Sequence, residues 1–386
     1  MAGWDWLIKP GRPYNWRFAG RVLIKAALLF VAVNLVYALT QPLPRLSQIT
    51  LYNTLLPGRL RLPFAEDSQA AYSVTLARIE GMFASHVISA GAPAGDEFRV
   101  VMLGDSSVWG WLLEPDETLS GCLNARELRT ADDRRLVVYN LGYPVLDVLK
   151  DTMILEEALN YEPDAVVWVI TLAGFYPDEQ LFHPIVRENA DRARSLIARY
   201  NLALDPAELP DEPNLWERTI IAQRRPLADL LRHQVYGFAW ALTGIDHVDP
   251  KFDERPTENL LPGDDIFGRP RVAGGWTEDN LSIDALRAGL DLAEQAGVPV
   301  LLVNEPIYRS SGLNSDVRYN AYYPRWAFDS YRELMDTLAA RDGWRYLDLW
   351  DAAPNDQFTD TSLHLTPAAT CALAETLTPA ILALAD

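Results

Sequence analysis

The feature that most constrains the fold is a series of short apolar runs that alternate with longer amphipathic patterns. Five runs have the composition of strands buried on both faces: Arg99 to Leu103, Leu136 to Leu141, Ala165 to Leu172, Pro299 to Val303 and Tyr346 to Leu349. Helical patterns lie between or after them, at Thr118 to Leu128, Val145 to Asn160, Ile283 to Ala296, Trp326 to Arg341 and Leu365 to Ala385. This alternation predicts a parallel sheet covered by helices on both faces.

A long insertion, roughly residues 175–280, separates the third and fourth predicted strands. It contains helical patterns at Arg187 to Tyr200 and Leu215 to Thr243, so its length favours a cap or a partner surface over a disordered loop. Within it, the apolar and aromatic stretch Val235 to Thr243 leaves two alternatives open. It is either core of the cap or a patch that rests on a bilayer interface.

The N-terminal region contains a candidate membrane anchor. Val22 to Thr40 is apolar except for Lys25 and Asn34, and at ~1.5 Å per residue it is about 28 Å long, close to the thickness of a bilayer core. Basic residues lie at or before its first end, with only Asp5 against them: Lys9, Arg12, Arg17, Arg21 and Lys25. The positive-inside rule then places this end in the cytoplasm and everything after Thr40 outside.

These observations predict four segments: a cytoplasmic N-terminus (1–21), an anchor (22–40), an extracytoplasmic linker with a helical pattern at Ala70 to Ile88 (41–97), and the main domain (98–386). A cleaved signal peptide is the alternative to the anchor. Its basic region would be unusually long, and the exit from Tyr37 to Pro42 lacks a small-x-small cleavage site. The sequence therefore favours an uncleaved anchor.

Composition narrows the classes of partner. Hydrophobic residues make up 49 % of the chain, which is ample for a large core, and the formal net charge is −19. A surface this acidic repels phosphate backbones, so nucleic acid is excluded as a partner. The two cysteines, Cys122 and Cys371, lie in apolar helical patterns and are expected to be buried small side chains. A bridge between them stays open, and cysteine usage does not define the redox compartment.

A Gly-Asp-Ser tripeptide directly follows the first predicted strand. Ser106, in Gly104-Asp105-Ser106, thus lies at the carboxyl end of a buried strand, where open α/β sheets place their functional sites. Gly104 permits a sharp exit from the strand. The chain then turns toward a helix, so backbone N–H groups there can face a developing oxyanion. The tripeptide is common, and its place after the strand is what predicts a nucleophile.

A serine nucleophile needs a general base, and His364 has the most suitable setting. It lies in Phe358 to Pro367, just before the last predicted helix, with carboxylates close before it. A carboxylate that orients the imidazole and stabilises its protonated form completes a serine triad. Asp360 is the expected partner and Asp356 the fallback, whereas a helix cap is the alternative role for His364. The other histidines are expected to be structural or surface groups: His86, His183, His233 and His247.

The segments GDSS (residues 104–107) and DTSLHLTP (residues 360–367) resemble the first and last blocks of the SGNH/GDSL hydrolase superfamily. The resemblance covers roughly Arg99 to Asp386 without the insertion, and it implies a flavodoxin-like three-layer α/β/α sandwich. By that pattern Ser106 is the nucleophile, His364 the base and Asp360 its partner. The backbone N–H groups of Ser106 and Gly142 would line the oxyanion hole.

Two departures from the family pattern concern the site. The third block usually contains an asparagine that donates to the oxyanion, but Val169 to Tyr176 contains none. The hydroxyl of Thr171 is a substitute, or the third donor is absent, and losing one donor costs on the order of 10²–10³ in rate. Asp360 is also one residue further from His364 than the family usually has.

Three further segments offer polar or aromatic groups. Asn304 and Glu305 follow the fourth predicted strand on the same sheet edge, as substrate-binding residues or, for Glu305, as a simple turn residue. Tyr319 to Trp326 is aromatic and suits either sugar stacking or packing beneath the insertion. The acidic run Asp249 to Asp265 lacks EF-hand spacing, so a solvated loop is expected, with no metal and no cofactor.

The anchor, the outside placement and the triad together resemble DltD-like and other cell-envelope SGNH proteins. That resemblance implies a serine esterase or O-acyltransferase that acts on O-acyl groups of envelope glycans or lipids through an acyl-enzyme. The missing asparagine motivates an alternative: an inactive SGNH-fold envelope protein that binds glycan or a membrane partner.

Overall fold

The computed structural model describes residues 15–56, 58–64, 76–90, 95–243, 261–266 and 268–385. The chain divides into two compact units. One comprises Met1–Leu43 with Glu212–Ala228, and the other Pro44–Asp211 with Asp229–Asp386. Part of the expected insertion therefore groups with the N-terminal helix instead of with the sheet. The second unit contains the sheet and the candidate catalytic residues.

Five parallel strands form the sheet, in the order β2-β1-β3-β4-β5. Each lies within two residues of its predicted run: β1 (Glu97–Leu103), β2 (Arg135–Asn140), β3 (Ala165–Ile170), β4 (Val300–Asn304) and β5 (Arg345–Asp348). Strands β1 and β3 are buried along their whole length, as their continuous apolar sequences predict. The strand order is that of flavodoxin-like folds, which confirms the predicted fold class.

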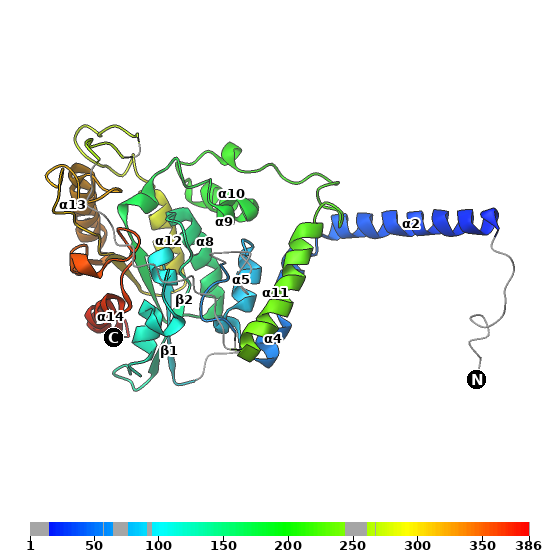
Figure 1. Ribbon diagram of the computed structural model, residues 1–386, viewed down its shortest axis with the longest axis horizontal. Helices are drawn as coiled ribbons and strands as arrows, with labels where there is room; N and C mark the ends of the chain where they lie inside the picture. Colours follow the sequence, from blue (N-terminus) through cyan, green and yellow to red (C-terminus); the bar gives the residue numbers. More distant parts are fainter. Residues whose placement is uncertain are drawn as a thin grey trace. The chain divides into compact units, whose positions relative to one another are not determined.

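Helices cover both faces of this sheet. α8 (Val148–Ala158) and α12 (Ile283–Gln295) pack side by side (Figure 1) and share one core with Val101, Trp168 and α13 (Arg325–Asp342). α7 (Leu119–Asn124) and α14 (Pro367–Leu382) share a second core with Val100 and Val167. Because successive residues of a strand point to opposite faces, these two cores are the two sides of a three-layer α/β/α sandwich.

The N-terminal helix α2 (Trp16–Thr40) begins six residues before the predicted anchor. The Asn15 side chain caps it by accepting from the Phe18 N–H at 2.9 Å. Its apolar side chains are exposed, unlike those of a buried core helix; Leu23, for example, is 69 % exposed. Among the described residues, this is the one helix long and apolar enough to cross a membrane, although a signal sequence has the same character.

The region between α2 and β1 is only partly helical. α3 (Leu43–Ser47) and α4 (Leu51–Leu55) follow α2, and the described part of the predicted helix at 70–88 forms α5 (Ile79–Ser85) and the 3-10 turn η1 (Val87–Ser89). Residues 65–75 and 91–94 lie outside the described part. The remaining 3-10 turns are η2 (Pro115–Glu117), η3 (Leu159–Tyr161), η4 (Leu172–Phe175), η5 (Pro206–Glu208) and η6 (Asn355–Gln357).

Two predicted helices of the insertion have different bounds in the structure. The pattern at 187–200 is divided into α9 (Pro184–Glu188) and α10 (Ala190–Tyr200) at Asn189, whose side chain donates to the Ala77 and Ile185 carbonyls. Such side-chain bonds to the backbone compete with regular helix. The second helix, α11 (Arg224–Thr243), begins nine residues later than predicted and has Pro226 in its first turn, where proline is tolerated.

The two cysteines form a disulfide bond that joins α7 to α14. The Cys122 and Cys371 Cα atoms are 5.2 Å apart, within the usual span of such a bond. The expectation of two unpaired buried side chains was wrong. The apolar patterns placed each cysteine correctly on a packed helix, but sequence alone does not reveal that α7 and α14 lie side by side on one face of the sheet.

Candidate active site

The candidate nucleophile, Ser106, is the first residue of the short helix α6 (Ser106–Trp109), which starts just after β1. Gly104 makes this turn with φ +151°, and a Cβ there would lie 2.6 Å from Val108 Cγ2, so a glycine is needed. Asp105 caps α6, because its Oδ1 accepts from the Ser107 N–H at 2.8 Å. The result is a partly exposed serine at the carboxyl edge of the sheet.

The predicted base and its carboxylate complete a continuous hydrogen-bonded chain with this serine. Ser106 Oγ lies 2.8 Å from His364 Nε2, and His364 Nδ1 lies 2.8 Å from Asp360 Oδ1. When Nδ1–H donates to Asp360, Nε2 is left without a proton and accepts from the serine hydroxyl. This is the arrangement of a Ser-His-Asp triad.

A closed loop brings Asp360 to His364 despite the extra residue between them. Phe358 pairs with Leu365 in an antiparallel bridge, and the Thr359 N–H donates to the His364 carbonyl at 2.9 Å. The Thr359 hydroxyl also donates to Asp360 Oδ1 at 3.1 Å. The loop therefore absorbs the unusual spacing, and the carboxylate that meets the imidazole is Asp360.

The electrostatics of Asp360 suit its place beside the imidazole. Burial disfavours its charge, but the hydrogen bond and the charge of His364 outweigh burial and hold the pKa of Asp360 below its ordinary value. Asp360 consequently stays ionised at neutral pH, as a group that stabilises an imidazolium must.

Aromatic side chains border the triad. The Trp111 ring stacks on the His364 ring, with centroids 5.9 Å apart, and Phe64 lies 6.1 Å from Trp111. On the triad's carboxylate side, burial and then the charges of Asp360 and Asp105 raise the pKa of Tyr322. Partly exposed aromatic side chains, Trp111 and Phe64, thus lie beside the candidate triad.

Gly142 lies where the sequence placed it, just beyond β2, but its amide has a partner. The N–H donates to Asn140 Oδ1 at 3.1 Å. A Cβ on Gly142 would lie 2.5 Å from the Trp109 N atom, so the glycine also lets the backbone after β2 approach α6 closely. Its role as an oxyanion donor stays a prediction, because that role requires the Asn140 contact to yield.

Thr171 also differs from its expected role. It is buried at the end of β3, and its hydroxyl lies 3.0 Å from the Tyr323 hydroxyl. A hydroxyl held by a buried tyrosine is already engaged, and the replacement of the family asparagine by Thr171 remains a prediction.

Asn304 and Glu305 lie at the expected sheet edge, but both are buried. The Asn304 amide donates to Asp348 Oδ1 at 2.8 Å, which ties β4 to β5. Glu305 Oε2 accepts from the Ser107 hydroxyl at 2.6 Å, so Glu305 supports the helix that begins with the nucleophile. Both side chains are enclosed and hold neighbouring segments of the site, and their role in substrate binding stays a prediction.

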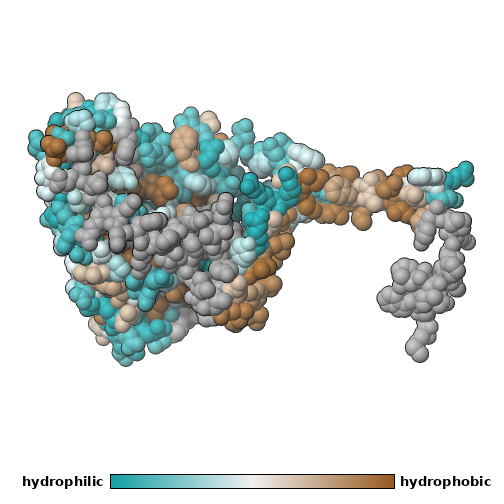
Figure 2. Space-filling view, viewed as in Figure 1, coloured by the Kyte–Doolittle hydropathy of each residue, from teal (hydrophilic) through white to brown (hydrophobic). Residues whose placement is uncertain are grey.

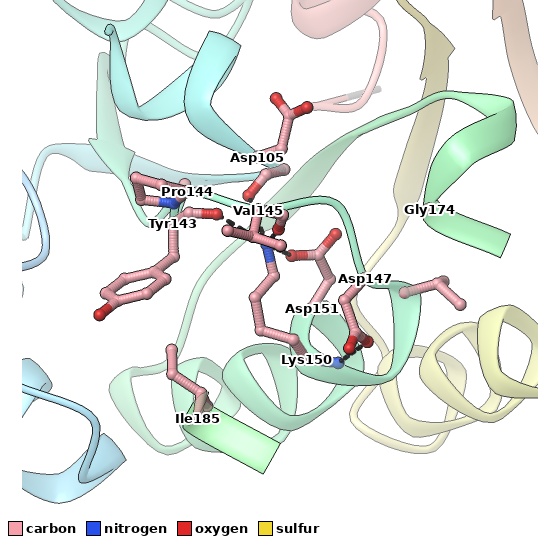
Figure 3. Close-up of polar contacts among 12 residues, drawn as sticks. Asp105, Tyr143, Pro144, Val145, Asp147, Lys150, Asp151, Gly174 and Ile185 are labelled. Carbon is pink, nitrogen blue, oxygen red and sulfur yellow. Dashed lines mark hydrogen bonds and ion pairs between the residues drawn. The ribbon is translucent and has the colours of Figure 1, made fainter. Parts of the chain in front are cut away.

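Lys150, which is not among the predicted site residues, is a fully buried lysine beneath the candidate site. Its ammonium donates to the Gly104, Tyr143 and Val145 carbonyls, at 3.2, 2.7 and 3.0 Å, and lies 2.9 Å from Asp151 Oδ1. Figure 3 shows the side chain extending from α8 to these carbonyls. One cation therefore links the end of β1 to the loop after β2.

That loop contains a backbone conformation that needs support. Val145 has φ +74°, the left-handed region that a β-branched residue rarely adopts, and its side chain is 60 % exposed. Lys150 holds the Val145 carbonyl, and such strain is usually maintained by its surroundings at functional sites. A lysine between Asp147 and Asp151 in an otherwise apolar helical pattern was the sequence signal for this cluster.

The chain is similar to known proteins only at the level of solved structures among the comparisons made. No family model and no curated protein matches the chain. Similar solved structures include a GDSL-like lipase from Bacteroides thetaiotaomicron (12 % identity, TM-score 0.37, covering 78 % of this chain and 95 % of that one). A carbohydrate acetylesterase family member from Sinorhizobium meliloti has 14 % identity and a TM-score of 0.33, covering 74 % and 98 %. The aryl esterase of M. smegmatis has 12 % identity and a TM-score of 0.32, covering 74 % and 99 %.

The chain's own geometry agrees with the resemblance that its sequence carries. The sheet has the flavodoxin-like order, Ser106 follows β1, and His364 precedes the last helix. The fold is thus a flavodoxin-like α/β/α sandwich, as the resemblance to SGNH/GDSL hydrolases implies.

The other sequence-derived candidates lie away from the triad or have packing roles. His86, His183 and His233 are buried, and burial lowers their pKa values to about 4, 3 and 3 respectively. His247 and most of the acidic run Asp249 to Asp265 lie outside the described residues. In the aromatic segment, Tyr319 and Tyr323 are buried and pack on Phe328, which supports a packing role.

Proposed function

We propose that the chain is a membrane-anchored serine esterase or O-acyltransferase that acts on O-acyl groups of cell-envelope glycans or lipids. The observation that carries the proposal is the unbroken contact from Ser106 Oγ through His364 to Asp360, with 2.8 Å at each step. A scaffold protein has no need of this arrangement, whereas acyl transfer requires each of its three groups.

The proposed reaction proceeds in two halves. Ser106 Oγ attacks the ester carbonyl carbon while His364 Nε2 takes the serine proton, and the resulting imidazolium is stabilised by Asp360. The same proton passes to the leaving alcohol as the ester C–O bond breaks, which leaves an acyl-Ser106. A water molecule or an acceptor alcohol then gives its proton to Nε2 and attacks the acyl carbon, and Ser106 recovers the proton as it leaves.

Two features support an extracytoplasmic site. The basic residues before the apolar segment put its N-terminal side in the cytoplasm under the positive-inside rule. The Cys122–Cys371 bond joins helices of the catalytic unit, and disulfides persist chiefly in oxidising compartments. The envelope substrate class comes from the resemblance, and the aromatic border of Trp111 and Phe64 is compatible with either a sugar or an acyl chain.

The test is turnover of p-nitrophenyl esters of increasing acyl length by the full-length protein, by His364→Ala and by Thr376→Ala, an exposed position on α14. We expect the wild type and Thr376→Ala to hydrolyse at equal rates and His364→Ala to lose activity on the order of 10⁴-fold or more. Adding a polyol acceptor then separates transfer from hydrolysis, because transfer yields an acylated polyol at the expense of free acid.

The second candidate function is a catalytically inactive envelope protein that binds glycan or a membrane partner. The engaged donors favour it: the Gly142 amide is bonded to Asn140, and the Thr171 hydroxyl contacts Tyr323. If the wild type and His364→Ala both hydrolyse the esters only at the background rate, the binding function is supported and the enzymatic function is contradicted.

A further inference from the structure

The segment after the anchor has an inverted arrangement of polar and apolar residues. From residue 46 to 55, the side chains turned inward are polar: Ser47, Thr50 and Asn53 are buried. Apart from Gln48, the described residues that are exposed are apolar, with exposures of 39 % for Leu46, 53 % for Ile49, 57 % for Leu51 and 74 % for Leu55. The buried Asn53 amide donates to the Ala84 and His86 carbonyls and the Ser89 hydroxyl, so this orientation is fixed by specific bonds.

Helix α11 repeats the inversion beside it. Leu231, Val235 and Leu242 are 70 %, 65 % and 75 % exposed, and at 100° per residue they share one face of the helix. His233 and Gly237, on the opposite face, are buried. The helix therefore shows its apolar face outward, contrary to a helix that packs on a soluble core.

The two inverted elements are joined directly. The Gln234 side chain accepts from the Leu51 N–H at 2.8 Å and donates to the Ile49 carbonyl at 2.9 Å. The apolar face therefore comprises Leu46, Ile49, Leu51 and Leu55 on one element and Leu231, Val235 and Leu242 on the other. Figure 2 shows hydrophobic side chains gathered over α4.

We infer that this apolar face rests in the interfacial layer of the membrane that carries the anchor. The first residue of the face, Leu46, follows the last residue of α2, Thr40, by six positions, so at roughly 3.5 Å per residue the face begins within about 21 Å of the anchor's end along the chain. The inference rests on the membrane attachment in the proposed function and is independent of the triad.

Charge favours lipid over a protein partner as the occupant. The chain has a formal net charge of −19, yet residues 41–64 contain no Asp or Glu and include the exposed Arg45, whereas Arg59 and Arg61 are buried. An acid-free, aliphatic surface meets an anionic lipid headgroup layer without repulsion, and amphipathic elements of this kind bury their apolar side in the headgroup boundary. The face contains aliphatic side chains spread over two elements, whereas protein interfaces are enriched in aromatic and arginine anchors at their centres.

The test places an environment-sensitive fluorophore (NBD) on single cysteines in the full-length protein. Because Cys122 and Cys371 are disulfide-bonded, an introduced cysteine is the reactive thiol among the described residues. The positions are Leu55→Cys in α4 and Leu231→Cys in α11, both on the apolar face, with Leu313→Cys as the control, since Leu313 is also 70 % exposed but lies in a turn that is not part of this face. The protein is reconstituted into vesicles of phosphatidylcholine with phosphatidylglycerol, with and without brominated lipid.

We expect blue-shifted emission at positions 55 and 231 that brominated lipid quenches, and water-like, unquenched emission at 313. Three water-like positions in a preparation that resists alkaline extraction would overturn the apolar face as a lipid contact and leave the anchor intact. Release of the protein at alkaline pH would overturn the attachment as well. A fluorophore that is shielded in native membranes but not in pure-lipid vesicles would overturn the lipid assignment in favour of a protein partner. A fluorophore that is shielded in detergent only as the protein concentration rises would overturn it in favour of a second copy of the chain. Ester hydrolysis, measured on the same samples, reports the proposed activity separately.

Discussion

His364 Nδ1 lies 2.8 Å from Asp360 Oδ1, across a loop that is closed by the Thr359 N–H on the His364 carbonyl. The fallback carboxylate, Asp356, lies in η6 and is exposed. The imidazole thus has a defined partner despite the unusual spacing in sequence.

The first prediction follows from this contact. Asp360→Asn should lower kcat for p-nitrophenyl acetate on the order of 10³–10⁴-fold, because an amide neither fixes the required imidazole tautomer nor stabilises the imidazolium. Asp356→Asn is the matched control and should stay within a factor of about two, since exposed substitutions away from a site have small effects. Loss of activity in Asp356→Asn with retention in Asp360→Asn would reverse the assignment.

Glu305 gives a prediction about pH and stability. Burial, followed by the charge of Asp105, raises the pKa of Glu305 well above its ordinary value. Ionisation of this group therefore opposes folding, so its stabilising effect is full below the unfolded pKa of about 4.5 and is lost as pH rises toward the folded pKa. Glu305→Gln stays neutral, and its free energy of unfolding relative to wild type should increase between pH 4.5 and pH 8.

Urea unfolding of both proteins across that pH range measures the difference. The KM for ester should be unchanged in Glu305→Gln, because the side chain is enclosed and bonds to Ser107. A large rise in KM with a flat stability difference would instead support the predicted substrate-binding role of Glu305.

Lys150 gives a prediction about the support of the site. Lys150→Met leaves Asp151 buried without its cation and removes the donor to three carbonyls, so we expect a loss of about 3–5 kcal/mol in the free energy of unfolding. Lys150→Met combined with Asp151→Asn should recover part of that loss, because the double variant removes the buried charge as well. A double-mutant cycle by urea unfolding measures the coupling free energy between Lys150 and Asp151. Additive effects of the two substitutions on the free energy of unfolding would contradict the predicted coupling.

The disulfide bond gives a prediction about covalent state and stability. The protein unfolded without reductant should show no reactive thiol, because both cysteines are paired. The double variant Cys122→Ser with Cys371→Ser should lose about 2–5 kcal/mol in the free energy of unfolding, since the bond restrains the unfolded chain. Two titratable thiols in protein isolated from an oxidising compartment would show that the bond does not form.

The sheet and the contacts among Ser106, His364 and Asp360 could be predicted because both depend on local signals. Buried parallel strands have continuous apolar sequences, Ser106 follows such a strand, and His364 with Asp360 lies in the loop just before the last helix. The disulfide bond could not be predicted, because it depends on which helices pack on the same face of the sheet. The contacts of Lys150 could not be predicted either, because its side chain reaches backbone carbonyls of two other segments. The partners of Gly142 and Thr171 are likewise three-dimensional facts, which position after a strand does not reveal.

Covalent labelling of Ser106 tests the central claim most directly. Full-length protein is treated with a fluorophosphonate, digested and analysed by mass spectrometry, beside Ser106→Ala and Ser107→Ala. The account predicts one adduct, on Ser106, in the wild type and in Ser107→Ala, and none in Ser106→Ala. An adduct on another residue, or equal labelling of the wild type and Ser106→Ala, would contradict it.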